Sequence, residues 1–385
     1  MPRPQLGILS AEAVRMLVLG YMSGTSLDGV DAALVETDGA RIEAFGPSFL
    51  SPFTDSERAV IEAGVDAALA WNGRGPARPS FGAVEAVVHA AHLRAAEAVI
   101  AQAGRRPELI GFHGQTVLHR PEQRLSVQVG DAQALADALG IAVVAGMRQD
   151  DLAAGGQGAP LVPAYHAALA SKLGLGAPVA FLNLGGVANL TFIGSDGALI
   201  AFDTGPANGL IDQVVQSRGA GRYDDGGRFA AAGRADAAVL AHLLSHAHFR
   251  GEGPRSLDRY DFPLDWADAC SLEDAAATLT AFTADSVALA AAGLPEAPRL
   301  WVICGGGCHN PVLMQALRDR LGECRSADDF GLRSDFVEAE AMAFLAARSL
   351  RGLPLTYPGT TGVPQPLTGG TLWRPRNGSW LLQDQ

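Results

Sequence analysis

Lysine is nearly absent from this sequence: Lys172 is the only one among 385 residues. A Walker-A phosphate loop places a lysine beside its second glycine, and the protein-kinase motifs place one on a strand, so both classes are excluded. A Schiff-base mechanism would have to use Lys172, which lies at the predicted exposed end of a helix. If the protein handles phosphate groups, it must therefore use backbone amides, arginines and a metal ion.

Cysteine is also scarce, and four cysteines in so long a chain do not make a disulfide framework. Residues 1–16 carry charges and lack the apolar stretch of a signal peptide, and no uncharged apolar window of about 18 residues predicts a membrane span. The net charge of −12 disfavours nucleic acid and anionic membrane as partners. We expect a cytoplasmic enzyme with no nucleic-acid and no membrane partner.

Glycine is abundant, and its 46 residues gather in short runs at the ends of apolar stretches. The first such pattern predicts strands at 16–22, 30–36 and 40–45, and a second predicts strands at 179–184, 190–193 and 198–202. A repeat of about 160 residues is too long for a solenoid and indicates two related lobes. We predict an α/β protein whose lobes each open with a three-stranded antiparallel meander. The predicted lobes are 14–145 with 352–385, and 146–351.

The remaining segments predict mixed sheets covered by helices, with a cleft between the lobes where a ligand would bind. The predicted helices are 81–103, 131–139, 272–292, one from 311 onward, and 336–350. The predicted further strands are 109–112, 125–129 and 300–304.

Two glycine-bordered turns are candidates for phosphate binding. Gly24–Asp31 combines hydroxyl side chains with glycines that let amides approach an anion, although a hairpin turn without a ligand uses the same residue types. Asn183–Asn189 is its counterpart in the second lobe. Two such turns facing each other across a cleft would hold a polyphosphate from both sides.

A third glycine run, Gly305-Gly306-Gly307, lies between a predicted strand and a predicted helix. Its bare backbone suits a base or a ribose. Cys304 and Cys308 flank the run, but no second ligand pair accompanies them, so we interpret both as packing residues.

Asp203 ends the predicted strand 198–202 and enters a Gly-Pro turn. A carboxylate at a strand end beside a cleft is well placed to act as a general base, and a turn-capping role is the alternative.

Further polar residues follow the short predicted strands in the first half of the chain. They suit a polyhydroxy ligand that carries a carboxylate, because an arginine could bind the carboxylate. They include His113 and Gln115, the segment ending at Asp131, and Arg148; His113 alone is also consistent with a structural histidine. His242, His246 and His248 have metal-like spacing, but without a nearby carboxylate pair we interpret them as a helix-end cluster.

Taken together, these motifs resemble those of the anhydro-N-acetylmuramic acid kinase family, in the family's order from about Met16 to about Leu350. The segments that carry the resemblance are Gly20–Asp31, Phe112–Thr116, Arg148–Leu161, Asn183–Leu190, Phe202–Asn208 and Gly305–Gly307. The resemblance implies the actin-like ATPase fold, with two ribonuclease-H-like lobes and an interlobe cleft. It also implies that water opens the 1,6-anhydro bridge of 1,6-anhydro-N-acetylmuramic acid while O6 takes the γ-phosphate of ATP. The products are N-acetylmuramic acid 6-phosphate and ADP.

The family pattern and the residues above lead to the following expected roles. The catalytic base is Asp203. Nucleotide contacts come from Gly24, Thr25, Ser26, Leu27, Asp28, Gly29, Val30, Asp31, Gly185, Gly186, Asn189, Gly305, Gly306 and Gly307. Sugar contacts come from His113, Gln115, Asp131, Arg148 and Asn208. ATP and Mg²⁺ are the expected cofactors, the metal ligands are not assigned, and the family suggests a homodimer.

Two other functions remain open at this point. One is a kinase of the same fold that phosphorylates an ordinary hexosamine without opening a bridge. The other is a non-catalytic, nucleotide-dependent module of the kind found among chaperones and cytoskeletal proteins of the group.

Overall fold

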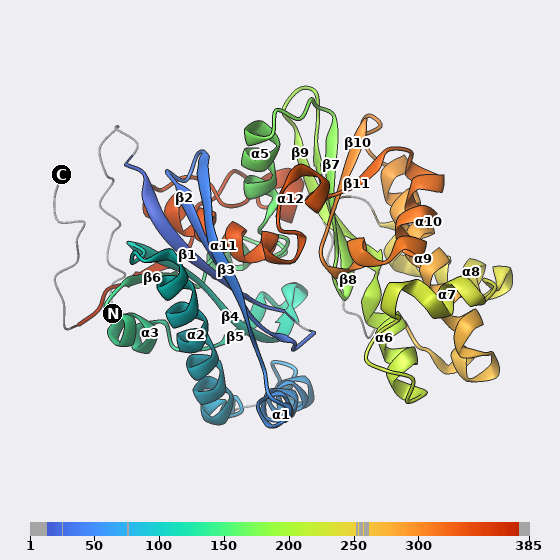
Figure 1. Ribbon diagram of the computed structural model, residues 1–385, viewed down its shortest axis with the longest axis horizontal. Coiled ribbons are helices and arrows are strands. Elements are labelled where there is room, and N and C mark those ends of the chain that lie inside the picture. Colours follow the sequence, from blue (N-terminus) through green and yellow to red (C-terminus); the bar gives the residue numbers. More distant parts are fainter. Residues whose placement is uncertain are drawn as a thin grey trace. The chain divides into compact units, whose positions relative to one another are not determined.

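The structure is a computed structural model that describes residues 14–24, 26–74, 77–251, 253, 257 and 262–376. The chain divides into two compact units (Figure 1). Unit 1 comprises Met1–Lys172 and Glu338–Gln385, and unit 2 comprises Leu173–Val337.

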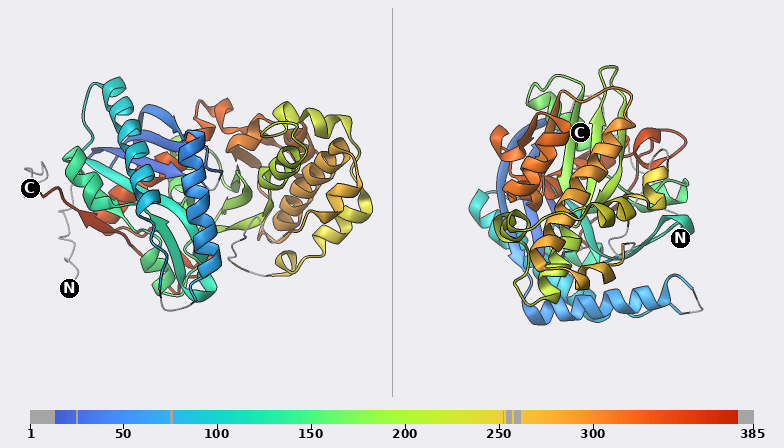
Figure 2. Two further views of the ribbon diagram at one scale, coloured as in Figure 1. Left: turned by 90° about the horizontal axis from the view of Figure 1, so that it is seen from below. Right: turned by 90° about the vertical axis from the view of Figure 1, so that its right-hand side faces the viewer.

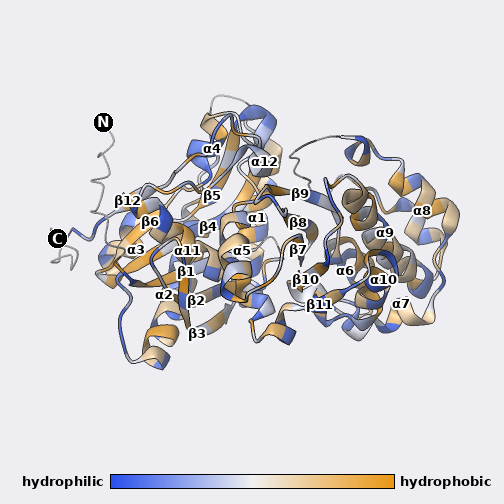
Figure 3. Ribbon diagram, turned by 90° about the horizontal axis from the view of Figure 1, so that it is seen from above, coloured by the Kyte–Doolittle hydropathy of each residue, from blue (hydrophilic) through white to orange (hydrophobic). Residues whose placement is uncertain are grey.

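Unit 1 is built on a seven-stranded mixed sheet. Its strands are β1 (Met16–Ser23), β2 (Gly29–Thr37), β3 (Ile42–Pro52), β4 (Leu109–Arg120), β5 (Leu125–Val129), β6 (Ala142–Ala145) and β12 (Thr371–Trp373). Their order is β12-β6-β4-β1-β2-β3, with β5 paired to β4. Strands β1, β3, β4 and β6 run in one direction, and β2, β5 and β12 run in the other. Strand β6, which lies next to the edge strand β12, is buried and hydrophobic at every residue (Figure 3).

The helices of unit 1 cover both faces of this sheet. They are α1 (Asp55–Trp71), α2 (Gly82–Ala103), α3 (Ala132–Leu139), α4 (Gln149–Ala153), α5 (Pro163–Lys172), α11 (Val337–Leu350) and α12 (Pro358–Thr361). Helices α1 and α2 contact one another (Figure 2). Successive side chains of a strand point to opposite faces. Tyr21 of β1 meets His92 of α2, with ring centroids 4.9 Å apart, so α2 covers the face to which Tyr21 points.

The opposite face of β1 carries Gly20, whose parallel neighbour on β4 is Gly111. A Cβ on Gly20 would lie 1.9 Å from the carbonyl oxygen of Ala339, and one on Gly111 would lie 2.1 Å from that of Met342. The backbone of α11 therefore rests directly on the two strands, and glycine is the residue that permits this approach.

Unit 2 is built on a five-stranded mixed sheet. Its strands are β7 (Val179–Leu184), β8 (Val187–Ile193), β9 (Leu199–Pro206), β10 (Leu300–Cys304) and β11 (Cys324–Ser326), in the order β11-β10-β7-β8-β9. Its α-helices are α6 (Asn208–Ser217), α7 (Arg228–Ala232), α8 (Ala237–Leu244), α9 (Leu272–Ala292) and α10 (Pro311–Leu321). Short 3₁₀ turns include η3 (Ala247–Arg250), η6 (Gly306–His309), η7 (Ala327–Phe330) and η8 (Ser334–Phe336).

The series β3-β2-β1-β4-β6 in unit 1 and β9-β8-β7-β10-β11 in unit 2 thus follow the same pattern, in which the second strand of the series, β2 or β8, is antiparallel to the other four. This is the ribonuclease-H-like topology, and the α/β class, the two related lobes and the two meanders predicted from the sequence are confirmed. Helix α9 is the one helix among the described residues that is long and apolar enough to cross a membrane by those two criteria. Most of that helix, 61 % of its apolar window, is buried inside the protein.

Several predicted element boundaries are wrong. The strand predicted at 40–45 begins at Ile42 and continues through Gly46-Pro47 to Pro52, because the β2–β3 pairing absorbs irregular register near Ala33 and Val35. The strand predicted at 109–112 continues to Arg120, because its polar half pairs with β5 as a hairpin. A local run of apolar residues cannot predict strand pairing between segments that are distant in the sequence.

Residues 146–172 and 338–351, which the sequence assigned to the second lobe, fall in unit 1. Lys172 at the end of α5 donates from Nζ to the carbonyl oxygen of Glu43, at 2.8 Å, and α11 rests on β1 and β4 as described above. Composition does not change at either point, so only the contacts show to which unit these helices belong.

Candidate functional site

The β1–β2 turn of unit 1, residues 24–28, is held by a side chain from β4. Gln115 is fully buried, and its Nε2 donates to the carbonyl oxygen of Gly24 at 3.2 Å. Its Oε1 accepts a hydrogen bond from the hydroxyl of Ser23, which also donates to the carbonyl oxygen of Gly29 at 3.3 Å. Gln115 therefore positions the predicted phosphate turn, and its predicted contact with a sugar remains a prediction.

Within this turn, Gly24 has open space where a Cβ would lie, with its nearest neighbour, Ser26 Oγ, 3.6 Å away. Leu27 has a φ of +57° and a buried side chain, so the turn is anchored in the core. At Gly29 a Cβ would lie 2.4 Å from the carbonyl oxygen of Ser51, so this glycine serves the pairing with β3. Thr25 lies outside the described residues.

An arginine that the sequence analysis did not single out reaches the same turn. Arg58, on the first turn of α1, donates from Nη1 to the carbonyl oxygen of Ser26 at 3.4 Å. The same nitrogen lies 3.9 Å from Oδ1 of Asp28. In a chain with one lysine, this guanidinium is a cation that the fold brings to the β1–β2 turn. An arginine on an amphipathic helix carries no signal of this role in the sequence.

A small, partly open pocket of about 10 Å³, room for roughly one water molecule, lies elsewhere in unit 1. Its lining combines apolar residues with a few polar groups. The lining residues are Phe112, His113, Gln128, Gly146, Met147, Arg148 and Met342. Two of the predicted sugar-binding residues, His113 and Arg148, are thus brought together.

His113 is held neutral in this pocket. Burial lowers the pKa of His113 to about 3, and the neighbouring Arg148 charge acts in the same direction. Arg148 donates from Nε to His113 Nε2 at 2.9 Å, so Nδ1 carries the ring proton and donates it to the carbonyl oxygen of Gly114 at 2.8 Å. Arg148 also donates from Nη1 to the carbonyl oxygen of Gly158 at 2.6 Å.

Glu338, in the first turn of α11, belongs to the electrostatic surroundings of Arg148 and was missed by the sequence analysis. Burial raises the pKa of the Glu338 carboxyl, and the Arg148 charge acts against that rise. The two residues are far apart in the chain, so no motif joins them.

Asp131, the remaining predicted sugar contact in unit 1, caps a helix. Its Oδ1 accepts a hydrogen bond from the backbone N–H of Ala134, at 2.9 Å, at the start of α3. Its predicted contact with the sugar remains a prediction beside this structural role.

In unit 2, the β7–β8 turn and the start of α6 are joined by backbone and side-chain hydrogen bonds. Asn208 donates from its backbone N–H to the carbonyl oxygen of Gly185 at 2.9 Å and from Nδ2 to that of Leu184 at 2.9 Å. Gly209 donates from its backbone N–H to the carbonyl oxygen of Gly186 at 3.1 Å. Asn208 therefore holds the glycine turn against the helix.

The three glycines after β10 pack against the β7–β8 turn and the end of β7. A Cβ on Gly305, whose φ is +75°, would lie 2.4 Å from Asn183 Oδ1, and one on Gly307 would lie 2.5 Å from Leu184 Cβ. Gly306 faces open space. We call Gly185, Gly186, Gly305, Gly306 and Gly307 the glycine corner: the structure brings these predicted nucleotide-binding residues together from two separate segments.

A row of polar side chains crosses the sheet beside the glycine corner. Asn183 of β7 pairs with Asn189 of β8, and Asn189 pairs with Asp203 of β9. Directly opposed residues share a face of a sheet, so the three side chains point the same way. Oδ1 of Asn189 is buried and has no hydrogen-bond partner among the described residues. A buried acceptor of this kind is expected to meet a donor or a cation from a ligand.

The prediction that Asp203 ends its strand is wrong, because β9 runs on to Pro206. The pairing of β8 with β9 shifts between Ala188 and Asn189, and this irregularity lies beside Asp203. Oδ2 of Asp203 accepts a hydrogen bond from the backbone N–H of Leu257 at 2.8 Å. The carbonyl oxygen of Asp203 accepts one from His248 Nε2 at 2.9 Å.

The histidines 242, 246 and 248 do not gather as a metal site among the described residues. His248 contacts Asp203 as just described, and His246 packs against Phe262 with ring centroids 4.7 Å apart. Their interpretation as a structural cluster is consistent with these contacts.

Comparison with known proteins shows one family. A family profile described as "Anhydro-N-acetylmuramic acid kinase" matches residues 16–375. A protein of that name from Phenylobacterium zucineum is 50 % identical over 369 residues, which cover 94 % of this chain and 100 % of the relative. A protein of the same name from Caulobacter vibrioides is 51 % identical over 365 residues, covering 93 % and 98 % of the two chains.

Among solved structures, an activator of the 2-hydroxyisocaproyl-CoA dehydratase from Clostridium difficile with bound ADPNP aligns with a TM-score of 0.44 and 11 % identity. The alignment covers 87 % of this chain and 96 % of that one. Nothing about ligands follows from similarity at that level.

Proposed function

Since the chain belongs to the anhydro-N-acetylmuramic acid kinase family, we propose that it is an ATP-dependent kinase of 1,6-anhydro-N-acetylmuramic acid. Water opens the internal 1,6 bridge, and O6 takes the γ-phosphate of ATP. The products are N-acetylmuramic acid 6-phosphate and ADP. The observation that carries the proposal is that residues of the family's motifs gather at two places, around Arg148 and His113 in unit 1 and at the glycine corner with the Asp203 row in unit 2.

The sugar is assigned to the pocket around Arg148 and His113. A sugar acid needs a cation for its carboxylate and neutral donors and acceptors for its hydroxyls. Arg148 supplies the charge, and the neutral His113 is held in one tautomer by its two hydrogen bonds. Gln115, Asp131 and Asn208 are the further sugar contacts that we propose, each in addition to the structural role described above.

The nucleotide is assigned to the two glycine turns. Backbone amides of Gly24 and residues 26–31, together with those of the glycine corner, are proposed to bind the phosphates, with Thr25 included by the family pattern. Gly306 leaves open space beside the backbone, as a ribose or base lying against it would need. Phosphoryl transfer depends mainly on positioning and charge neutralisation, which amide dipoles provide.

Magnesium fits this nucleotide site. Mg²⁺ takes oxygen ligands and commonly binds phosphates, water and one or two protein oxygens. Oδ1 of Asn189, which is buried and has no hydrogen-bond partner in the part of the chain that the structure describes, is such an oxygen, so Asn189 is the residue that would face the ion. When bound, the ion would neutralise negative charge on the phosphates.

Asp203 is the proposed base. Its carboxylate takes a proton from a water molecule, whose oxygen then bonds to the anomeric carbon as the bond from that carbon to O6 breaks. The electron pair left on O6 bonds to the γ-phosphorus, and ADP departs. The hydrogen bond from Leu257 N–H to Oδ2 orients the carboxylate of Asp203. A cytoplasmic location and a homodimer belong to the same proposal.

One isotope experiment tests the proposal against the two alternatives. The protein is incubated with ATP, Mg²⁺ and the anhydro sugar in ¹⁸O-labelled water, and the label is located by mass spectrometry. Label at the anomeric hydroxyl of a 6-phosphorylated product supports coupled opening and transfer. Phosphorylation of N-acetylglucosamine with the anhydro sugar untouched would favour a hexosamine kinase, and slow ATP hydrolysis without any sugar product would favour the nucleotide-dependent module.

A further inference from the structure

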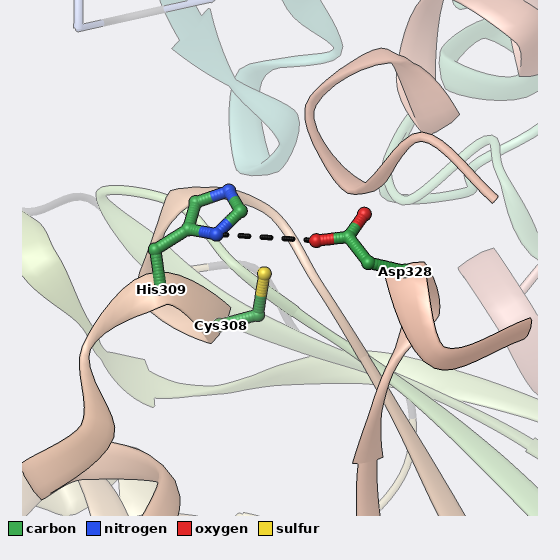
Figure 4. Close-up of side chains that lie close together, drawn as sticks. All are labelled: Cys308, His309 and Asp328. Carbon is green, nitrogen blue, oxygen red and sulfur yellow. Dashed lines mark ion pairs between the residues drawn. The ribbon is translucent and has the colours of Figure 1, made fainter. Parts of the chain in front are cut away.

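Cys308, His309 and Asp328 form a compact cluster of metal-ligand side chains in unit 2 (Figure 4). Their ligand atoms, a sulfur, an imidazole nitrogen and a carboxylate oxygen, all lie within 4.8 Å of one another. The first two residues are in η6 and the third is in η7, so the cluster joins two separate segments. We propose that these three side chains bind a divalent cation of the zinc class, with water as the fourth ligand.

The donor set selects the class of ion. Zinc is bound in proteins by thiolate, imidazole and carboxylate in tetrahedral sites, whereas magnesium and calcium take oxygen ligands. The site is therefore separate in chemistry from the magnesium expected on the nucleotide. Binding exchanges the thiol proton of Cys308 for the metal, so one proton is released to solvent for each ion bound.

The distances are compatible with closure around an ion. Metal–ligand bonds of about 2.0–2.3 Å in a tetrahedral site place ligand atoms roughly 3.3–3.8 Å apart. His309 Nδ1 lies 3.9 Å from Asp328 Oδ2. Figure 4 shows the Cys308 sulfur pointing into the space between these two groups. Because 53 % of the His309 side chain is exposed, small rotations can complete the geometry.

The surrounding hydrogen bonds already orient two of the ligands. His309 Nε2 lies 3.3 Å from Asp335 Oδ1, and this contact directs Nδ1 toward Asp328. Histidine ligands of zinc commonly donate their second ring N–H to a carboxylate in this way. Asp328 accepts hydrogen bonds from the backbone N–H of Ser334 at 3.1 Å and from its hydroxyl at 3.2 Å.

The sequence analysis interpreted Cys308 as a packing residue because no second ligand pair follows in the chain. Its side chain does belong to the core of unit 2. Its ligand partners, however, are an adjacent histidine and an aspartate from another segment, which no cysteine spacing reports. Since η6 begins at Gly306, a bound ion would also restrain the glycine corner; that consequence rests on the proposed function, whereas ion binding does not.

Titration with Co²⁺, which replaces zinc and absorbs visible light, tests the proposal on the full chain after treatment with a chelator. We expect one Co²⁺ per chain, intense visible bands of tetrahedral cobalt, a near-ultraviolet thiolate-to-cobalt band, and loss of all these bands when Zn²⁺ is added. The thiolate band should vanish in Cys308→Ser, and affinity should fall at least tenfold in Asp328→Asn. Cys270→Ser changes a cysteine of unit 2 outside the cluster and should leave the titration unchanged.

His309→Gln keeps the proposal falsifiable if Cys308→Ser fails to fold, because the exposed His309 side chain can be replaced without a packing cost. It should also bind Co²⁺ at least tenfold more weakly. The proposal would be overturned if the natural protein showed no thiolate band, or if the Co²⁺ titration were unchanged in Cys308→Ser or His309→Gln. Because every readout is spectroscopic, the outcome is independent of kinase activity.

Discussion

The side chains of Arg148 and His113 are joined by a hydrogen bond of 2.9 Å from Nε to Nε2. The bond requires an unprotonated Nε2, and the pKa of His113, lowered to about 3, keeps it so. The planar guanidinium thus serves two acceptors at once, the ring and the carbonyl oxygen of Gly158. A lysine ammonium cannot reproduce this planar arrangement.

We expect Arg148→Lys to raise the KM for the anhydro sugar at least tenfold, about 1.4 kcal/mol of binding, while the KM for ATP changes little. The measurement is steady-state kinetics with each substrate varied in turn. Arg124→Lys, an exposed arginine elsewhere in unit 1, is the matched control and should behave as the natural protein does. An unchanged KM for the sugar in Arg148→Lys would remove Arg148 from the sugar site.

Asp203→Asn should abolish product formation and leave nucleotide affinity within a few-fold, because the amide cannot accept a proton from water but occupies the same volume. Product formation is followed by chromatography and nucleotide binding by calorimetry. Asp196→Asn, at the exposed β8–β9 hairpin turn, is the control and should retain full turnover. Near-normal turnover of Asp203→Asn would refute the assignment of the base.

Arg58→Ala should raise the KM for ATP about tenfold, since the Arg58 guanidinium contacts the β1–β2 turn, to which the nucleotide phosphates are assigned. Arg58→Lys should restore part of the loss because the charge is kept. Arg94→Ala is a matched control, because it removes another arginine contact of α1, the 3.0 Å pair with Glu57. Equal effects of the Arg58 and Arg94 substitutions would mean that Arg58 acts only through the stability of α1.

The stability of the protein should fall as the pH decreases below about 6.5. Burial lowers the pKa of His92 to about 4 and that of His166 to about 3, in addition to His113. Between those pKa values and about 6.5, the unfolded chain binds protons that the folded chain does not. Each of these histidines therefore lowers the free energy of unfolding by roughly 1.4 kcal/mol for each pH unit of acidification. The contribution is fully present above pH 6.5 and is lost on acidification.

Urea unfolding at a series of pH values measures this slope. His92→Gln removes one buried imidazole and should make the slope between about pH 6 and pH 5 shallower by roughly 1.4 kcal/mol per pH unit. His89→Gln, on the same helix, has a side chain that is not fully buried and should leave the slope unchanged. An identical slope in His92→Gln would show that His92 does not remain neutral in the folded state.

Gly20→Ala should destabilise the protein by about 3 kcal/mol or more, because the new Cβ would lie 1.9 Å from the carbonyl oxygen of Ala339 and α11 would have to move. Gly176→Ala is the control: no atom lies within 4 Å of its added Cβ, so the change should stay within about 0.5 kcal/mol. Thermal and urea unfolding measure both. If Gly20→Ala unfolds as the natural protein does, the close packing of α11 on β1 is not required for stability.

The local patterns of the sequence were sufficient for the repeated meanders, for the α/β class and for most of the glycine corner. Strand alternation and glycine-rich turns are properties of neighbouring residues, and they appear twice in the chain in the same order. Helix α9 and strands β7 and β10 have the predicted bounds because each is a long or continuous apolar segment with clear ends.

The sequence by itself therefore determined the family, the secondary structure of the two lobes and the residue types available for binding phosphate and sugar. Only the tertiary structure decided that Gln115 holds the β1–β2 turn, that Glu338 shares the surroundings of Arg148, and that Cys308 lies close to Asp328. The physical reason is the range of the interactions. Hydrogen bonds between distant segments, the dielectric environment of a buried carboxyl and the convergence of ligand atoms arise when separate elements pack together, and no local spacing of residues encodes them.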